Sequence, residues 1–403
     1  MATENNNKTL NVPNLRFPEF SGEWESNELH KVASLSKGAG ISKDQLSDSG
    51  HPCILYGELY TKYKSEIIRE VYSKTQLDVA NLVKSHTNDV IIPCSGEAAI
   101  EIATARCVLI PDVLLGGDLN IIRLNGRHDG GFFAYQLNGK RKVDIAKVAQ
   151  GVSVVHLYGE HLKKVKVAYP SLEEQQKISS FLALLDERIA TQIKIIEKLE
   201  SLIRGLITDV NSGRIAQCKS VYLRDLLTEQ HEKNTNNYEV CSVSVSQGVI
   251  NQIDYLGRSF AAKEVLHYNV VNCGDIVYTK SPTGEFPYGI VKRSDITKPV
   301  AVSPLYGVYR PINDYVGRYL HLYFKSPINA KNYLHKLIQK GAKNTINITN
   351  QHFLDNKILI PEKGWLENIV NFAAAIEMKI ATENKVLQTL QQQKDYLLSK
   401  MFI

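Results

Sequence analysis

The sequence predicts an α+β fold in which two mixed α/β domains are separated by two long antiparallel helices that form a coiled coil. The segments after Pro170 and Pro361 align without a gap, and the two prolines lie 191 residues apart. Both segments carry apolar residues at alternating steps of four and three, the seam that a partner helix buries. A period this long indicates a tandem repeat of a whole domain plus helix, with a pseudo-two-fold relation between the copies.

Turn signals and short β-type runs between the helices complete the division of the chain. In order, we expect an N-terminal segment (1–25), a first domain (26–169), a central spacer helix (170–211), a second domain (212–360) and a distal spacer helix (361–403). Proline followed by acidic residues is typical of a helix start and marks both long helices. Within the second domain, helical stretches are expected near 316–325 and 328–339.

The two domains also align with each other, though less closely than the helices. Asp89-Val90-Ile91 matches Asp275-Ile276-Val277, and His161 falls on His352. The two helix segments align without a gap, whereas the two domains diverge. This indicates a constant helical framework that carries two different domains.

Gln192 and Glu383 occupy equivalent seam positions in the two helices. A polar pair near mid-helix can set the register of antiparallel helices, so we expect these side chains to lie close together. Lys394 also falls on the seam of the distal helix. The alternative is that each long helix packs on an ordinary core. The residues expected at the helix pair are Ile178, Leu185, Ile189, Gln192, Ile196, Ile376, Ile380, Glu383 and Leu387.

Composition sets further limits. With 43% hydrophobic residues, the 403-residue chain can form packed cores in two or three domains. Its six cysteines are scattered and its histidines lack metal-ligand spacing, which favours the reducing cytoplasm and predicts no metal site. We expect no signal peptide and no membrane span. The net charge of +6 permits an anionic partner without requiring one.

Several segments give the chain a family resemblance. They are the opening 12–20 with Trp24, the segment 41–63, the block Tyr169-Pro170-Ser171-Leu172-Glu173-Glu174-Gln175-Gln176-Lys177-Ile178, the tetrad Gly274-Asp275-Ile276-Val277, and the distal helix. Together they make the chain resemble the specificity subunit of a Type I restriction-modification system. The second copy departs from the pattern, because it lacks the pair that corresponds to Glu174 and Gln175.

The resemblance implies a non-catalytic reader of double-stranded DNA. Each domain would be a target-recognition domain for one half of a bipartite, asymmetric site, and the helices would set the gap. Two methyltransferase (modification) subunits would dock on the helices, bind S-adenosylmethionine and methylate adenine at N6, so this chain would need no cofactor of its own. Motor-nuclease (restriction) subunits would join them.

The residues agree with this division of labour. An adenine methyltransferase needs a Gly-rich cofactor loop and an Asn/Asp-Pro-Pro-aromatic motif, and neither occurs in the sequence. The only G-x-G, Gly38-Ala39-Gly40, has Lys43 where a third glycine would stand, so we interpret it as a loop. There is no Walker motif. An autonomous enzyme is therefore a poor fit, whereas a stand-alone two-headed DNA-binding regulator remains an alternative.

Basic and aromatic residues in loops are the candidates for DNA contact. Lys and Arg supply salt-sensitive phosphate contacts, whereas only side chains that reach base edges supply sequence choice. For any single basic residue, a solvated surface position is the simpler interpretation. The candidates are Lys37, Lys43, Tyr60, Lys62, Tyr63, Arg106, Arg123, Arg127, Lys140 and Arg141 in the first domain, and Tyr278, Lys280, Ser281, Thr283, Arg293, Lys340, Lys343 and Asn344 in the second.

Overall fold

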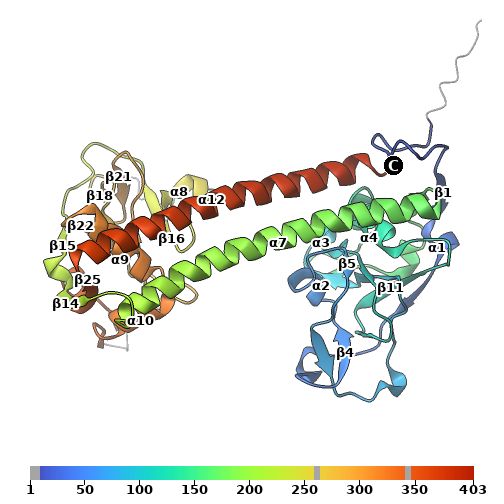
Figure 1. Cartoon of the computed structure of the whole chain (residues 1–403), viewed down its shortest axis with the longest axis horizontal. Helices are drawn as coiled ribbons and strands as arrows, with labels where there is room; N and C mark the ends of the chain where they lie inside the picture. The colour runs from blue at the N-terminus through green and yellow to red at the C-terminus, as the bar shows by residue number, and fades with distance from the viewer. Residues whose placement is uncertain (1–9, 258–263, 341–345) are drawn as a thin grey trace, which may run out of the picture. The chain divides into compact units, whose positions relative to one another are not determined.

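The computed structural model describes residues 10–257, 264–340 and 346–403. The chain divides into two compact units, unit 1 with Met1–Ile195 and Glu383–Ile403, and unit 2 with Ile196–Thr382. Both predicted long helices are confirmed as α7 (Leu172–Asn211) and α12 (Lys363–Lys400), coloured green and red in Figure 1. Each unit therefore contains one mixed α/β domain together with a part of each long helix.

The first domain, in unit 1, is built on a five-stranded sheet. Its strand order is β2 (Ala33–Lys37), β11 (Leu119–Leu124), β7 (Asp89–Pro93), β9 (Arg106–Val108) and β5 (Ile67–Ile68). Only the β5–β9 pair is parallel. All five residues of β7 are buried, because this short apolar run lies between two neighbouring strands.

Smaller elements surround this sheet. A four-stranded sheet has the order β10 (Leu114–Leu115), β4 (His51–Ile54), β6 (Ser73–Thr75) and β3 (Leu46–Ser47). Two-stranded ribbons pair β1 (Glu25–Glu28) with β13 (Lys166–Tyr169) and β8 (Ser95–Gly96) with β12 (Val155–His156). The helices are α1 (Leu29–Val32), α2 (Glu58–Thr61), α3 (Ala99–Ile102), α4 (Gly130–Asn138), α5 (Lys142–Val148) and α6 (Gly159–Leu162), with 3-10 turns at Lys43–Gln45 and Val79–Asn81.

The end of α12 belongs to the core of the first domain. The Trp24 ring lies 5.6 Å from that of Phe132 and 6.5 Å from that of Phe402, measured between centroids. The backbone N–H of Leu15 donates a hydrogen bond to the carbonyl of Lys400 at 2.9 Å. The N-terminal segment and the C-terminus of the distal helix are thus packed together within unit 1.

The second domain, in unit 2, has a four-stranded sheet with the order β15 (Leu227–Glu229), β22 (Gly307–Pro311), β19 (Ile276–Thr279) and β20 (Ile290–Arg293), all antiparallel. Its ribbons pair β14 (Cys218–Tyr222) with β25 (Lys357–Pro361), β16 (Cys241–Ser244) with β17 (Gly248–Asn251), β18 (Asn269–Val271) with β21 (Val300–Val302), and β23 (Gln339–Lys340) with β24 (Ile346–Asn347). Its helices are α8 (Gln252–Leu256), α9 (Asp314–Phe324), α10 (Pro327–His335) and α11 (Asn350–Phe353), with a 3-10 turn at Leu223–Asp225.

The predicted alignment of the domains is confirmed by one repeated ion pair. Asp89, at the start of β7, accepts two hydrogen bonds from Arg123 on β11, at 3.0 and 2.8 Å. Asp275, just before β19, pairs in the same way with Arg310 on β22, at 3.2 Å. Each aspartate also accepts a hydrogen bond from the backbone N–H three residues earlier. The two domains therefore repeat one strand pair with its buried carboxylate.

Candidate nucleic-acid interface and helix pair

Within unit 1, α7 and α12 run antiparallel and meet at the predicted polar pair. The Gln192 side-chain amide donates a hydrogen bond to the backbone carbonyl of Glu383 at 3.0 Å and another to its carboxylate. The expectation that these two residues lie close together is confirmed. A polar pair at one seam position penalises slipped registers, because any shift would leave buried polar atoms unpaired.

The other predicted seam residues have two roles. Leu185 and Ile196 are buried, whereas Ile189 and Leu387 are half-buried. Ile178 belongs to the core of the first domain, and Ile376 to that of the second, where Ile380 packs against it. The alternative of a helix that packs on an ordinary core thus holds for part of each helix. Some seam residues therefore pack between the two helices, and others pack a helix against its domain.

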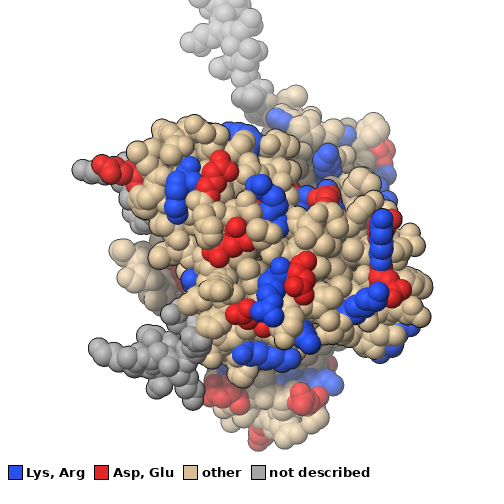
Figure 2. Space-filling model, turned by 90° about the vertical axis from the view of Figure 1, so that its left-hand side faces the viewer, with Lys and Arg blue, Asp and Glu red and all other residues tan. Residues whose placement is uncertain are grey.

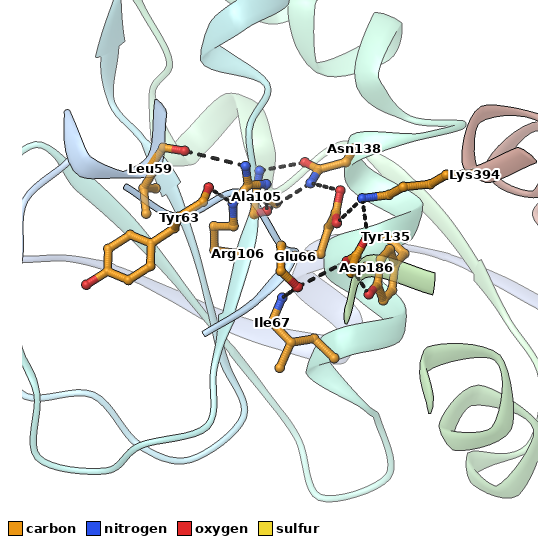
Figure 3. Close-up of polar contacts among 11 residues, drawn as sticks. Leu59, Tyr63, Glu66, Ile67, Ala105, Arg106, Tyr135, Asn138, Asp186 and Lys394 are labelled. Atoms are coloured by element: carbon orange, nitrogen blue, oxygen red, sulfur yellow. Dashed lines mark hydrogen bonds and ion pairs between the residues drawn. The ribbon is translucent and has the colours of Figure 1, made fainter. Parts of the chain in front are cut away.

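Lys394 is half-buried at the seam and joins α12 to α7 and to the segment before β5, all within unit 1 (Figure 3). Its amine lies 2.6 Å from a carboxylate oxygen of Glu66 and 2.6 Å from one of Asp186, on α7. Asp186 also accepts a hydrogen bond from the Tyr135 hydroxyl at 2.8 Å. Burial opposes the charge of Asp186, yet Lys394 and these hydrogen bonds hold its pKa below the ordinary value. Burial raises the pKa of Glu66 despite the same lysine.

This Glu66–Asp186–Lys394 cluster was not predicted. Its only signal in the sequence is a lysine at a position where the first helix copy has an isoleucine, Ile203. Because the three side chains are largely enclosed, the cluster fastens the distal helix to the first domain and to α7.

A groove in the first domain brings together two of the predicted DNA contacts. Its volume is about 1040 Å³, and Lys43, Tyr56 and Lys62 are among the residues that line it. Lys43 is exposed, and the Lys62 amine lies 2.7 Å from the Glu58 carboxylate. Gly40, Gly57, Gly116 and Gly117 are also among the lining residues, and the lack of a side chain allows close approach of a ligand to the backbone. Exposed ammonium groups and an aromatic ring in one groove can hold phosphates and stack on a base.

The remaining exposed candidates of the first domain lie outside this groove. Lys37 ends β2, Arg127 lies on the loop before α4, and Lys140 lies on the turn before α5; all three are exposed. Arg141 is partly buried and lies 3.4 Å from Asp144. Tyr60 is half-buried, with its hydroxyl 3.5 Å from the Ser95 carbonyl.

The structure corrects five predicted contacts. Arg106 is buried and donates hydrogen bonds to the carbonyls of Leu59, Tyr63 and Ala105. Arg293 is buried and pairs with Asp295 and Asp314, and Arg123 is held by Asp89. The buried rings are Tyr63, which stacks on Tyr72, and Tyr278, which donates its hydroxyl hydrogen to the Tyr288 carbonyl. Because these side chains are buried or held by partners within the protein, they stabilise the domains and are no longer candidate DNA contacts.

In the second domain, Lys280, Ser281 and Thr283 lie exposed on the loop between β19 and β20. A tight turn closes this loop, because Thr283 and Phe286 exchange backbone hydrogen bonds at 3.1 and 2.8 Å. Burial lowers the pKa of Lys280, which still has no ion pair with the residues described in the structure.

The second predicted basic cluster of this domain is only partly described. The backbone of Lys340 belongs to β23, whereas Lys343 and Asn344 lie outside the described residues.

The face of the molecule in Figure 2 shows Lys and Arg side chains interspersed with Asp and Glu, so no large basic patch covers it. Any DNA contact on that face would depend on individual loops, since charge of one sign does not dominate.

The described ranges contain no cluster of three or more residues with metal-ligand chemistry. No helix among the described residues is long and apolar enough to cross a membrane.

Residues 21–201 match the family described as the Type I restriction modification DNA specificity domain. This part of the chain belongs to the specificity family. A relative from Methanocaldococcus jannaschii, provisionally named the type I restriction enzyme MjaX specificity subunit, is 24% identical over 225 residues. That match covers 53% of this chain and 51% of the relative, so the chain spans about half the length of this curated relative.

Solved structures share the fold of this chain. The S subunit of a Type I restriction-modification system from M. genitalium superposes with a TM-score of 0.59 at 14% identity, covering 97% of this chain and 99% of that one. A chain from a structure of type I R-M complex assembly and conformational transition gives 0.54 at 12% identity, covering 94% and 97%. The likeness extends over both domains and both long helices, which confirms the predicted fold class.

Proposed function

We propose that the chain is the DNA sequence-recognition subunit of a Type I restriction-modification complex in the cytoplasm. Each domain reads one half of a bipartite, asymmetric site in double-stranded DNA, and the helices set the spacer between the halves. The observation that carries this proposal is the repeat of one framework in two domains whose loops differ. The family match over residues 21–201 supports the same function.

The helix pair offers a surface for the modification subunits. A groove of about 1090 Å³ between α7 and α12 within unit 1 is lined by Phe181, Leu184, Val386 and Tyr396, among others. Leu184 is 60% exposed and Tyr396 58% exposed, and contiguous exposed apolar side chains are typical of protein interfaces. We propose that adenine-N6 methyltransferase subunits dock here, bring S-adenosylmethionine with them, and are joined by motor-nuclease subunits. This chain itself would perform no chemistry.

The proposal is tested by selecting DNA from a random pool with the chain assembled on its methyltransferase partner. We expect the selected DNA to contain two short fixed sequences separated by a constant number of unspecified base pairs. Selection of one uninterrupted sequence would contradict the two-domain reading. Tight, site-specific binding by the isolated chain, with no methylation by the complex, would instead favour a stand-alone regulator.

Single basic residues should contribute phosphate contacts that respond to salt. For Lys43→Ala or Lys280→Ala, we expect weaker DNA binding and a log–log salt slope shallower by about 0.9 for each lost phosphate contact. Fluorescence anisotropy of labelled duplex from 50 to 200 mM salt, the range over which such contacts matter, measures both. Lys331→Ala, an exposed lysine on α10, is the matched control. An unchanged slope in both variants would remove these residues from the interface.

A further inference from the structure

A buried lysine in unit 2 has no counter-charge. Lys292 lies on β20 and is 4% exposed. Its side chain lines a cavity of about 440 Å³ within the second domain and the adjoining part of α7. Among the residues that the structure describes, no side chain or carbonyl forms a hydrogen bond or an ion pair with its amine. Its side chain is buried and its amine is reached only from the cavity, so the ammonium group is poorly solvated and has no counter-charge among these residues, which is costly.

In the first domain, the same position holds an arginine that has hydrogen-bond partners within the protein. Strand register aligns Lys292 with Arg106, because Lys292 pairs with Val277 on β19 and Arg106 pairs with Ile91 on β7. All three hydrogen bonds of the Arg106 guanidinium go to backbone carbonyls. In the second domain, the corresponding residue is Lys292, which lines the cavity and has no such hydrogen bonds with the residues that the structure describes.

The walls of the cavity combine an apolar lining with a positive end. Ile203, Ile207 and Phe286 supply apolar surface. Ser326, the N-cap of α10, also lines the cavity, so the N-terminus of that nine-residue helix lies at its wall. Helix N-termini favour negative charge.

The charged residues around the cavity leave Lys292 unneutralised. Arg204 lies 3.8 Å from Glu200, and Lys325 lies 3.4 Å from Glu377, so each of these cations already has a carboxylate. Glu285 is exposed and lines the cavity. Burial, followed by the charge of Lys325, lowers the pKa of Lys292 to about 8, and no carboxylate counteracts this shift. The amine is therefore mostly protonated at neutral pH and lacks an anion.

We propose that this cavity binds a small organic anion, a carboxylate or phosphate ester with an apolar body, whose charged group pairs with Lys292. The volume of 440 Å³ lies within the range of roughly 300–1,000 Å³ that is usual for small-molecule sites. Ile203, Ile207 and Phe286 would enclose the apolar body. The Ser326 hydroxyl would supply a further hydrogen-bond donor, and the N-terminus of α10 a favourable dipole. This site is separate from DNA recognition and does not depend on the function proposed above.

The test measures protection of Lys292 from acetylation by acetic anhydride, read by peptide mass spectrometry of the full chain. Benzoate and phenyl phosphate probe the two anionic groups on one apolar body, and inorganic phosphate probes the charge alone. We expect benzoate or phenyl phosphate to slow modification of Lys292 and leave Lys331, exposed on α10, unchanged. Inorganic phosphate should protect more weakly, because it lacks the apolar body.

Variants separate the charge from the cavity. Lys292→Met keeps the length of the side chain and should weaken binding, measured by calorimetry, at least about tenfold, the effect of losing one charge-assisted contact. Ser326→Asp retains an N-cap acceptor for α10 and brings its own carboxylate, so it should also weaken binding. Lys331→Met should leave affinity unchanged. For native protein, affinity should fall as the pH rises through about 8, since the neutral amine cannot pair with an anion.

Two results would overturn the proposal. One is the absence of protection of Lys292 by either aromatic anion at millimolar concentration. The other is binding of equal affinity in native protein and Lys292→Met, which would place the ligand elsewhere.

Discussion

Replacement of Lys394 with methionine should lower the free energy of unfolding of unit 1 by about 3–5 kcal/mol, the cost of removing one partner from a buried ion pair. Lys394 is 15% exposed, whereas Glu66 is 8% and Asp186 5% exposed. Without the ammonium group, two carboxylates would remain close together in a poorly solvated site. Each would then have to take up a proton or draw in water at a cost in stability.

Urea unfolding of the full chain measures this effect. The chain has two tryptophans, so a Trp365→Phe background leaves Trp24, in the core of the first domain, as the reporter for unit 1. Lys385→Met, at an exposed position on α12, is the control and should change little. If Glu66→Gln and Asp186→Asn are added to Lys394→Met, part of the lost stability should return, because the unpaired charges are gone. A loss no larger than that of the control would show that the cluster does not fasten the distal helix.

Repetition in the sequence made much of the framework predictable. A seven-residue apolar period can be buried only by a partner along a narrow stripe, so the long helices and the proximity of Gln192 and Glu383 followed from spacing alone. The alignment of Asp89 with Asp275 anticipated the repeated carboxylate of the two sheets. In each of these predictions, a local pattern determines which residues must meet.

Other features depend on contacts that no local pattern specifies. Arg106 and Arg293 are basic, as DNA contacts require, yet both side chains are buried, where Arg106 bonds to carbonyls and Arg293 pairs with carboxylates. Residue type does not reveal which side of a short, fully buried strand a side chain occupies. Lys394 interrupts the apolar seam, and its role could not be predicted because its partner Glu66 lies 328 residues away in sequence. The order of strands in the sheets was likewise unpredictable from the runs themselves.

The second large effect concerns which DNA is read. Exchange of residues 215–355 for the matching region of a relative should change one half of the recognised site completely. We propose that base contacts come from loops such as 280–284, which lie inside the exchanged segment. The long helices and β25 lie outside it, and β25 pairs with β14 through backbone hydrogen bonds that tolerate sequence change. The other half-site and the gap should therefore be retained.

Mapping of methylated adenines in DNA exposed to the complex assembled on this chimera tests the central claim most directly. Core residues of unit 2, such as Leu223 and Tyr319, should be kept in the exchanged segment so that this unit still folds. We expect modified sites with one new half, one original half and an unchanged spacer. Simultaneous change of both half-sites would contradict independent reading by the two domains.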